Sequence, residues 1–465
     1  MRALLAAAAL FACAFPAPAF AQAPSAAERS QALELYRHVV GLDTSVEGKK
    51  NPEMAAYLAA RFRAAGFAEN DIHIINVADT AGLLVRYRGD GSGGAPILLL
   101  AHMDVVPAHR SDWERDPFTF IEEDGFFFGR GSLDNKAGLI HIAATLLTLR
   151  SEGFTPTRDL ILWFSGDEET TGATTTALLG EHRALIGDAE FALNSDAGGG
   201  ALTQNNQPIR YGLQTAEKTF ASFTFTARNP GGHSSAPRAD NAIYELAEAL
   251  IRLRAFQFPV MWNDTTLAML RQGAEGVAGP QAEAMRRFAA NPQDRRAQQN
   301  IAQIADISSM LRTTCVATLL DGGHAENALP QSAVATVNCR IFPGVAVAEV
   351  EAELRAIAGE GVEVAPFGPS SASDASPLRA DIVAAVTRAV HAHAPGVGIT
   401  PMMSAGATDG LYFRAAGIPT YGVGGVFIRG SDAFAHGLNE RVPVERFYNG
   451  LTHWRVLLTE IAGPR

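Results

Sequence analysis

One pair of side chains suggests chemistry by type and by spacing: His102 and Asp104 stand two residues apart. They follow residues 97–100, an apolar run with the length of a buried strand. Ligands of open α/β sheets bind at the carboxyl edge of the strands, so an imidazole and a carboxylate at that edge could begin a metal site. A histidine that only packs at the end of a strand explains the pair equally well. The rest of the chain must supply more ligands to decide between the two.

Four acidic side chains and a second histidine are the further candidates. Asp134 lies in the sequence GRGSLDNKAG, where it could cap the following helix or use its two oxygens to bridge two cations. Glu168 and Glu169 follow a second apolar run. One of them could bind a metal ion while the other takes a proton from water, although a solvated acidic turn is a common alternative. A short apolar run then leads to Asp196, and the sequence AHGLNER near the C-terminus contains His436.

The elements that must position these residues follow two patterns. Residues 22–212 and 368–465 alternate helical periodicity with continuous apolar strands, which is typical of an α/β domain. Residues 213–367 begin with a strand that largely alternates polar and apolar positions, and their later elements are of an α+β type. Within them, about 259–311 is polar and helical in character. The sequence therefore predicts one domain in two parts, interrupted by an inserted domain that carries a helical insertion.

The motifs around these residues resemble, in their order, those of the dizinc aminoacylase and carboxypeptidase family. They are the motifs of His102 and Asp104, Asp134, Glu168 and Glu169, Asp196, the sequence GGHSSAP at 231–237, and His436. The resemblance covers nearly all of the chain after the first 21 residues. It implies an α/β fold of the dizinc exopeptidase type, in which helices flank a mixed central sheet and an α+β lid or dimerisation domain is inserted. The sequence AGGG after Asp196 and the helical insertion are similar to the carboxypeptidase S branch.

The resemblance implies that five side chains bind two zinc ions, for which cobalt or manganese could substitute. His102 and Asp196 are expected to bind one ion, Glu169 and His436 the other, and Asp134 to bridge the two.

Two further acids have implied roles beside the metals. Asp104 is expected to accept a hydrogen bond from His102 and so fix its tautomer. Glu168 is expected to be the general base, which takes a proton from a metal-bridging water and returns it to the leaving amine. His233 in GGHSSAP matches a family position that stabilises the oxyanion, often across a dimer.

The resemblance also implies residues that contact the substrate. Asn327 and Arg340 match such positions in the inserted domain, and Gly406 lies in a glycine-rich loop that lines the family's substrate pocket. Ala407 and Gly410 depart slightly from the family form of this loop. A guanidinium binds a carboxylate in a bidentate way, so Arg340 would select substrates with a free α-carboxylate; a salt bridge on an exposed strand is the alternative for this residue.

The sequence thus predicts an exported zinc-dependent hydrolase, either a carboxypeptidase or an N-acyl-amino-acid hydrolase. An aminopeptidase or dipeptidase on the same scaffold is the alternative among enzymes. A periplasmic binding protein is the alternative from another class, but a binder would have no use for a base such as Glu168. Condensation of fatty acids with amino acids is the same chemistry in reverse, and bulk water favours net hydrolysis.

Charge and composition limit the possible partners. The formal net charge of −11 and the pI near 5.6 argue against a nucleic-acid or anionic-membrane surface. No segment after the N-terminus is apolar for long enough to span a membrane. The expected partners are a small-molecule or peptide substrate and, through the lid, a second copy of the chain.

The N-terminus and the cysteines bear on the compartment. Residues 1–21 have the basic start, apolar run and small-residue end of a secretory signal, which predicts a periplasmic or secreted protein. Cys13 lies in a sequence that only faintly resembles a lipoprotein signal, so soluble export is preferred. Cys315 and Cys339 lie in two apolar runs that could pair as antiparallel strands, and either a disulfide or two buried thiols would fit.

Overall fold

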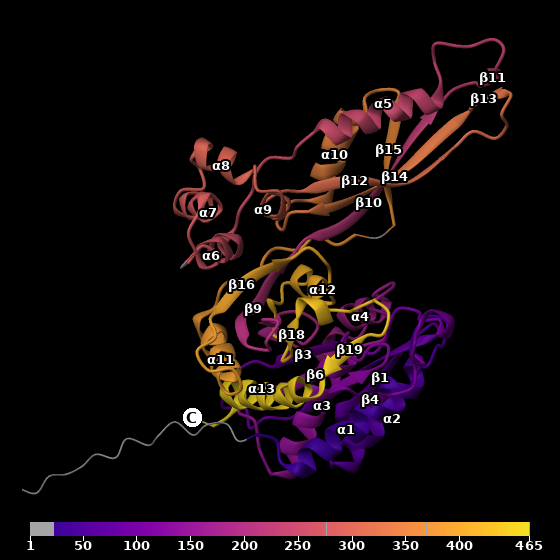
Figure 1. Ribbon diagram of the computed structural model, residues 1–465. Coiled ribbons are helices and arrows are strands. Elements are labelled where there is room, and N and C mark those ends of the chain that lie inside the picture. The colour runs from indigo at the N-terminus through magenta and orange to yellow at the C-terminus, as the bar shows by residue number, and fades with distance from the viewer. Residues whose placement is uncertain (1–22, 276, 369, 465) are drawn as a thin grey trace, which may run out of the picture.

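The structure is a computed structural model that describes residues 23–275, 277–368 and 370–464. The expected signal peptide, residues 1–21, lies outside these residues, as does Cys13. Figure 1 shows two lobes: a catalytic lobe, in which the last helix returns to the first helices, and a lid formed by the middle of the chain. Within the described residues, no helix combines the length and the hydropathy needed to cross a membrane.

A mixed central sheet forms the catalytic lobe. Its strands run in the order β1 (Ile72–Val77), β2 (Thr80–Tyr87), β6 (Leu160–Ser165), β3 (Ile97–His102), β7 (Phe191–Asn194), β17 (Thr420–Gly422), β9 (Pro208–Glu217), β8 (Gly199–Leu202) and β18 (Phe427–Arg429), and β16 (Ile399–Ser404) also pairs with β9. Strand β3 lies in the middle and is parallel to both β6 and β7. Every residue of β3 and β6 is buried, as expected for parallel strands covered on both faces.

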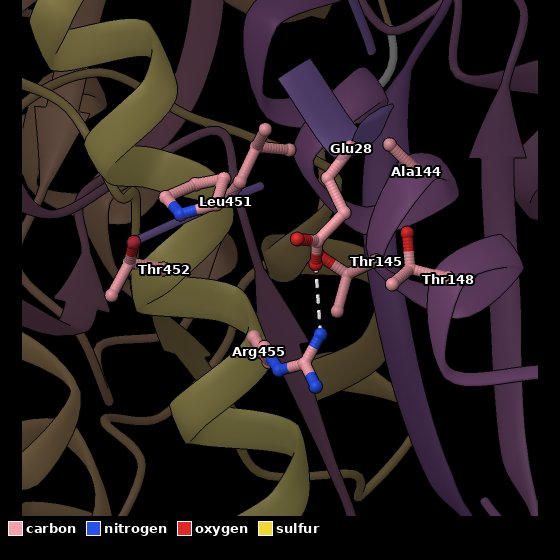
Figure 2. A pocket seen from close by; sticks show the side chains of 8 residues that line it. Glu28, Ala144, Thr145, Thr148, Leu451, Thr452 and Arg455 are labelled. Carbon is pink, nitrogen blue, oxygen red and sulfur yellow. Dashed lines mark hydrogen bonds and ion pairs between the residues drawn. The ribbon is translucent and has the colours of Figure 1, made fainter. Parts of the chain in front are cut away.

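Helices cover both faces of this sheet. One face packs against α1 (Ala26–Val40), α2 (Asn51–Ala64), α3 (Lys136–Ser151), α11 (Ala380–His391) and α13 (Val444–Ala462), and the other packs against α4 (Ala173–Leu179) and α12 (Gly410–Ala415). Alternate residues of β3 divide between the two cores: Leu99 belongs to the first and Leu100 to the second. Figure 2 shows a small cavity where α1, α3 and α13 meet, with Arg455 of α13 paired to Glu28 of α1 at 2.8 Å.

The lid contains a four-stranded antiparallel sheet with helices on one face. Its strands run in the order β12 (Thr314–Gly322), β14 (Ser332–Ile341), β10 (Thr219–Arg228) and β15 (Val362–Phe367), and the covering helices are α5 (Ala242–Ala255) and α10 (Val347–Ala358). Buried and half-buried residues alternate along β14, because only one face is covered. Strand β9 of the catalytic sheet continues into β10 of the lid through Lys218, so one extended segment joins the lobes.

The segment between α5 and β12 forms a group of short helices with its own small core. These helices are α6 (Asp264–Gly273), α7 (Pro280–Ala290), α8 (Arg295–Ile301) and α9 (Ala305–Met310). Met261 and Met310, at the two ends of this insertion, pack with Met403 of β16. The insertion therefore contacts the catalytic sheet as well as the lid (Figure 1).

The remaining elements are short. A pair formed by β11 (Gly232–His233) and β13 (Ala328–Leu329) lies at the far tip of the lid, and β19 (Arg441–Pro443), β5 (Phe126–Phe128) and β4 (Ile121–Glu123) form a small sheet in the catalytic lobe. The 3₁₀ turns are η1 (Glu69–Asp71), η2 (Arg110–Asp112), η3 (Arg183–Leu185) and η4 (Gly430–Asp432).

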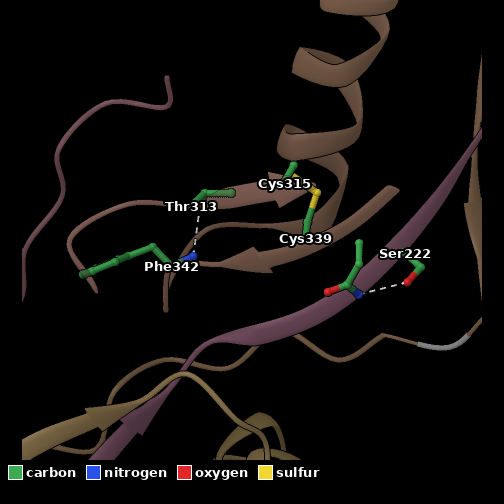
Figure 3. The surroundings of a disulfide bond; sticks show 6 residues. Ser222, Thr313, Cys315, Cys339 and Phe342 are labelled. Carbon is green, nitrogen blue, oxygen red and sulfur yellow. Dashed lines mark hydrogen bonds between the residues drawn. A yellow bond between two sulfur atoms is a disulfide. The ribbon is translucent and has the colours of Figure 1, made fainter. Parts of the chain in front are cut away.

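Cys315 and Cys339 form a disulfide. They lie directly opposite each other on the antiparallel strands β12 and β14, with their Cα atoms 4.1 Å apart (Figure 3). The expected strand pairing is confirmed, and of the two possibilities that the sequence leaves open the structure has the disulfide rather than two thiols.

Candidate metal centre

The order of the parallel strands brings three of the predicted segments together. His102 is the last residue of β3, Glu168 and Glu169 follow β6, and Asp196 follows β7. Because β6, β3 and β7 are parallel neighbours, their carboxyl ends meet at one edge of the sheet. Asp134 reaches the same edge from the turn before α3.

Two histidines lie close to different oxygens of the Asp134 carboxylate. His102 Nε2 lies 3.1 Å from Oδ1 of Asp134 and 3.5 Å from Oδ1 of Asp196. His436 Nε2 lies 2.8 Å from Oε1 of Glu169 and 3.4 Å from Oδ2 of Asp134. The two oxygens of Asp134 thus face different histidines, which is the arrangement that a carboxylate bridging two cations requires.

The donor set fits divalent cations. Donor atoms of His102, Asp134 and Glu169 lie within 4.8 Å of one another, and so do those of His102, Glu168 and Asp196. Imidazole nitrogens and carboxylate oxygens suit zinc, cobalt and manganese. The site collects four carboxylates against two imidazoles, and cations would neutralise the repulsion among these acids.

Burial perturbs the acids of this site. Burial and the charge of Asp196 raise the pKa of Glu168 well above its usual range. The pKa of Asp196 is raised to about 7 by burial, with Asp134 and Glu169 adding repulsion and His102 opposing it. The Glu169 carboxylate accepts a hydrogen bond from His436 and raises the pKa of that imidazole. Such perturbed acids, gathered in one cavity, are typical of functional sites.

Asp104 holds the backbone that carries the two glutamates. Its oxygens accept hydrogen bonds from the backbone N–H groups of Glu168 at 3.1 Å and Glu169 at 2.9 Å. His102 Nδ1 lies 3.0 Å from the backbone oxygen of Asp104 and 3.5 Å from its carboxylate. The backbone oxygen is therefore the nearer partner of the imidazole, and the carboxylate mainly orients the turn after β6.

Glu440 supports the turn that carries Asp134, and the sequence alone did not point to it. It is fully buried, and its carboxylate accepts backbone N–H groups of Gly131, Leu133 and Asp134 at 2.8–2.9 Å. It also pairs at 2.7 Å with the buried guanidinium of Arg130. The sequence feature that could have pointed to Glu440 is its position in the motif AHGLNER, four residues after His436.

The same ion pair also reaches His436. Arg130 donates to the backbone oxygen of His436 at 3.4 Å, and His436 has a φ of 62°, a left-handed conformation that non-glycine residues seldom adopt. Arg130 and Glu440 together therefore orient the turn of Asp134 and the loop of His436, which face each other across the candidate centre.

The predicted substrate-contacting residues and His233 fall into two groups. Gly406 lines a cavity of about 230 Å³ that also contains Asp134, Glu168 and Asp196. Arg340 lies next to this loop, because its guanidinium donates to the backbone oxygen of Ala405 at 3.2 Å.

His233 and Asn327 are placed elsewhere. Both are exposed at the tip of the lid, where Ser234, next to His233, donates its backbone N–H to the oxygen of Asn327 at 3.0 Å. His233 also bonds to Ser235. Neither residue is among those that line the cavity at the candidate centre.

Comparisons with known proteins agree with this geometry. Residues 98–460 match the model of peptidase family M20/M25/M40. The human N-fatty-acyl-amino acid synthase/hydrolase PM20D1 is 30% identical over 381 residues, which cover 78% of this chain and 74% of that protein. Carboxypeptidase S of Saccharomyces cerevisiae is 28% identical over 282 residues, 58% of this chain and 49% of that protein.

A solved structure supports the fold class. The M20 family metallo-carboxypeptidase Sso-CP2 of Sulfolobus solfataricus superposes with a TM-score of 0.68 at 17% sequence identity, covering 93% of this chain and 99% of that one. The expected α/β fold, with a mixed central sheet flanked by helices, is confirmed. Since the family match covers most of its length, the chain belongs to the peptidase family M20/M25/M40, a family of metallopeptidases and amidohydrolases, as its motifs predict.

Proposed function

We propose that this chain is an exported zinc-dependent hydrolase of N-acyl amino acids, or of peptides with apolar parts, that carry a free C-terminal carboxylate. The observation that carries the proposal is the cavity in which Glu168 lies beside the bridging carboxylate Asp134, with Arg340 next to the loop that lines it. The cavity offers a base for the reacting water, and the arginine offers a partner for a substrate carboxylate.

The proposed ligands follow the geometry. His102 and Asp196 would hold one divalent ion, Glu169 and His436 the other, and Asp134 both. When bound, the two ions would polarise the scissile carbonyl and lower the pKa of the attacking water. We propose zinc as the metal, with cobalt or manganese as possible substitutes.

The proton transfers are assigned to Glu168. Its place in the cavity beside Asp134 and Asp196 suits a carboxylate that takes a proton from the attacking water and then gives it to the leaving amine. Asp104 would keep the base and its neighbour Glu169 in place through their backbone N–H groups.

The substrate class rests on Arg340 and on the relatives. Arg340 has no acidic partner among the described residues; it contacts the backbone of Ala405 and lies 4.7 Å from the ring of Phe220. An unpaired guanidinium beside the cavity could bind the α-carboxylate of a substrate. The name of PM20D1 suggests fatty-acyl amino acids, and we propose hydrolysis as the net direction in water.

A substrate panel tests this proposal. Dipeptides and N-acyl amino acids of graded chain length, each with a free and an amidated C-terminus, would be incubated with metal-loaded protein. We expect amidation to lower kcat/KM by about 10- to 100-fold, the value of one charge-assisted hydrogen bond. Full activity on amidated substrates would instead favour an aminopeptidase or dipeptidase, and binding without hydrolysis would favour a binding protein.

We further propose a homodimer through the lid. Residues 213–367 would form the inserted lid between residues 22–212 and 368–465. Leu319 and Leu320 on the edge strand β12 are 65% and 73% exposed, and an unpaired edge of this kind can pair with another copy. A second copy could bring its His233 to the site that this chain's own His233 does not reach. Light scattering gives the molar masses of the wild type and of Leu320→Lys in solution. We expect a dimer for the wild type and a monomer for the variant, and a monomer mass for both proteins would contradict the association.

Export remains part of the proposal. A disulfide such as that between Cys315 and Cys339 persists in oxidising compartments, which is consistent with a periplasmic or secreted protein. Cell fractionation of the full-length chain, followed by N-terminal sequencing, tests this assignment.

A further inference from the structure

A second cavity lies in the lid, apart from the candidate metal centre. Its volume is about 700 Å³, within the range of roughly 300–1,000 Å³ that is usual for small-molecule sites. The end of α5, the segment after it, the end of the helical insertion and the start of β12 form its walls. The two cavities have no lining residue in common.

The walls of this lid cavity are mainly apolar. Leu250 and Leu253 come from α5, and Phe256 and Phe258 pack edge to face with their ring centres 5.0 Å apart. Val316 completes the wall from β12 next to the disulfide of Cys315, whose surroundings Figure 3 shows. Val316 is 61% exposed, so its apolar surface is not covered by the lid itself. Apolar surface of this kind favours an apolar occupant.

The charged side chains of the lid cavity are all cationic. Arg254 and Arg312 line it, and no acidic side chain is among the described residues that do. Arg312 donates to the backbone oxygen of Phe258 at 2.7 Å and to Ser308 at 3.1 Å. Arg254 makes no hydrogen bond or ion pair with any residue that the structure describes. Burial lowers the pKa of the Arg312 guanidinium, as expected where no carboxylate compensates its charge.

These features define the chemistry of the occupant. Apolar walls favour a chain of hydrocarbon, and two guanidinium groups with no carboxylate among the described lining residues favour an anion, for which a carboxylate is a good geometric match. This charge preference is local, because the protein as a whole has a formal net charge of −11. We propose that the lid cavity binds a long-chain fatty acid, with its hydrocarbon chain against the apolar walls and its carboxylate on Arg254 and Arg312.

The test measures binding rather than turnover, so it is independent of the proposed reaction. Palmitate would be titrated calorimetrically into the full chain carrying Glu168→Gln, with hexadecanol as the uncharged match. Arg254→Gln is the test variant, because Arg254 is exposed and makes no hydrogen bond or ion pair with the other described residues. Arg295→Gln is the matched control: Arg295 is an exposed arginine of the helical insertion and does not line the cavity.

We expect Arg254→Gln to weaken palmitate binding by about tenfold while hexadecanol binding is unchanged. Arg295→Gln should change neither affinity. Val316→Trp, which would fill the cavity from its exposed wall, should weaken both ligands. Equal palmitate affinity of the Glu168→Gln chain with and without Arg254→Gln would overturn the proposal, and so would the absence of palmitate binding.

Photo-crosslinking separates the two cavities. Palmitate with a diazirine at its end would be irradiated with the protein, and the labelled peptides would be mapped. Label within residues 250–258 or 302–317 supports the proposal. Label confined to residues 196–198 and 402–408, at the candidate metal centre, would show that the fatty acid binds there as a product and would refute a lid site. If the protein hydrolyses none of the substrates but is labelled in the lid, the proposed hydrolase function is refuted and the fatty-acid site in the lid is still supported.

Discussion

Replacing Glu440 by glutamine tests whether a buried carboxylate organises the candidate centre. One carboxylate oxygen accepts the N–H groups of Leu133 and Asp134, and the other accepts that of Gly131 and pairs with Arg130. An amide can keep the first set of bonds with its oxygen. Its NH₂ group would then face the N–H of Gly131 and the guanidinium of Arg130, which are both donors. The charge of Arg130 would therefore be buried without a partner.

The magnitude follows from this loss. Breaking a buried ion pair by removing one partner costs about 3–5 kcal/mol, and both side chains of this pair are at most 4% exposed. The same pair orients Asp134 and His436. Loss of such a supporting partner lowers metal affinity by about 10- to 100-fold. We therefore expect Glu440→Gln to lower both the urea midpoint and the affinity for zinc.

The assay combines urea unfolding of the metal-free chain with zinc competition against a fluorescent chelator. Glu445→Gln is the control, since the Glu445 side chain is 72% exposed and its ion pair with Arg29 is long, at 3.5 Å. We expect it to change stability by less than about 0.5 kcal/mol. A folded Glu440→Gln protein that binds zinc as tightly as the wild type would refute the reasoning.

Three further predictions follow from the site and the core. Glu168→Gln should keep its metal content but lower kcat by about 10²- to 10⁴-fold, because the base is lost while the other carboxylates remain; metal analysis and rate measurements check this, and wild-type turnover would contradict it. Arg340→Gln should raise KM for substrates with a free carboxylate and leave amidated substrates unaffected, and an equal rise for both would contradict the assigned role. His141 and His453 are fully buried, and burial lowers the pKa of His141 to about 3 and that of His453 well below its usual 6.5. Because the unfolded chain takes up these protons first, the contribution of each buried histidine to stability is fully present above pH 7 and falls as the pH drops below 6.5, by about 2 kcal/mol for His141 at pH 5. Urea midpoints of the wild type and His141→Gln at pH 7.5 and pH 5 check this, and a difference between the two proteins that does not change with pH would contradict it.

Much of the candidate site could be predicted because its signals are local. A continuous apolar run predicts a buried strand, and a polar residue directly after it must lie at the edge of the sheet. His102, Glu168 and Asp196 all have this pattern, and the structure brings them to one edge. The family can be recognised from the order of such motifs along the chain, because that order does not depend on which strands pair. Arg340 lies on β14, the apolar run that was expected to pair with the run of Cys315.

The tertiary structure alone decided which distant groups meet. Asp134 receives its support from Glu440, which is 306 residues away, and no local pattern distinguishes a carboxylate that will accept buried N–H groups from one on the surface. Strand register decided that Cys315 lies opposite Cys339. The fold also places His233 at the tip of the lid, away from the cavity that its motif suggests. The sequence by itself therefore determined the family, the strand ends and the donor types, since these depend on neighbouring residues. Strand order, register and buried hydrogen bonds depend on packing across the whole chain, and only the folded structure determines them.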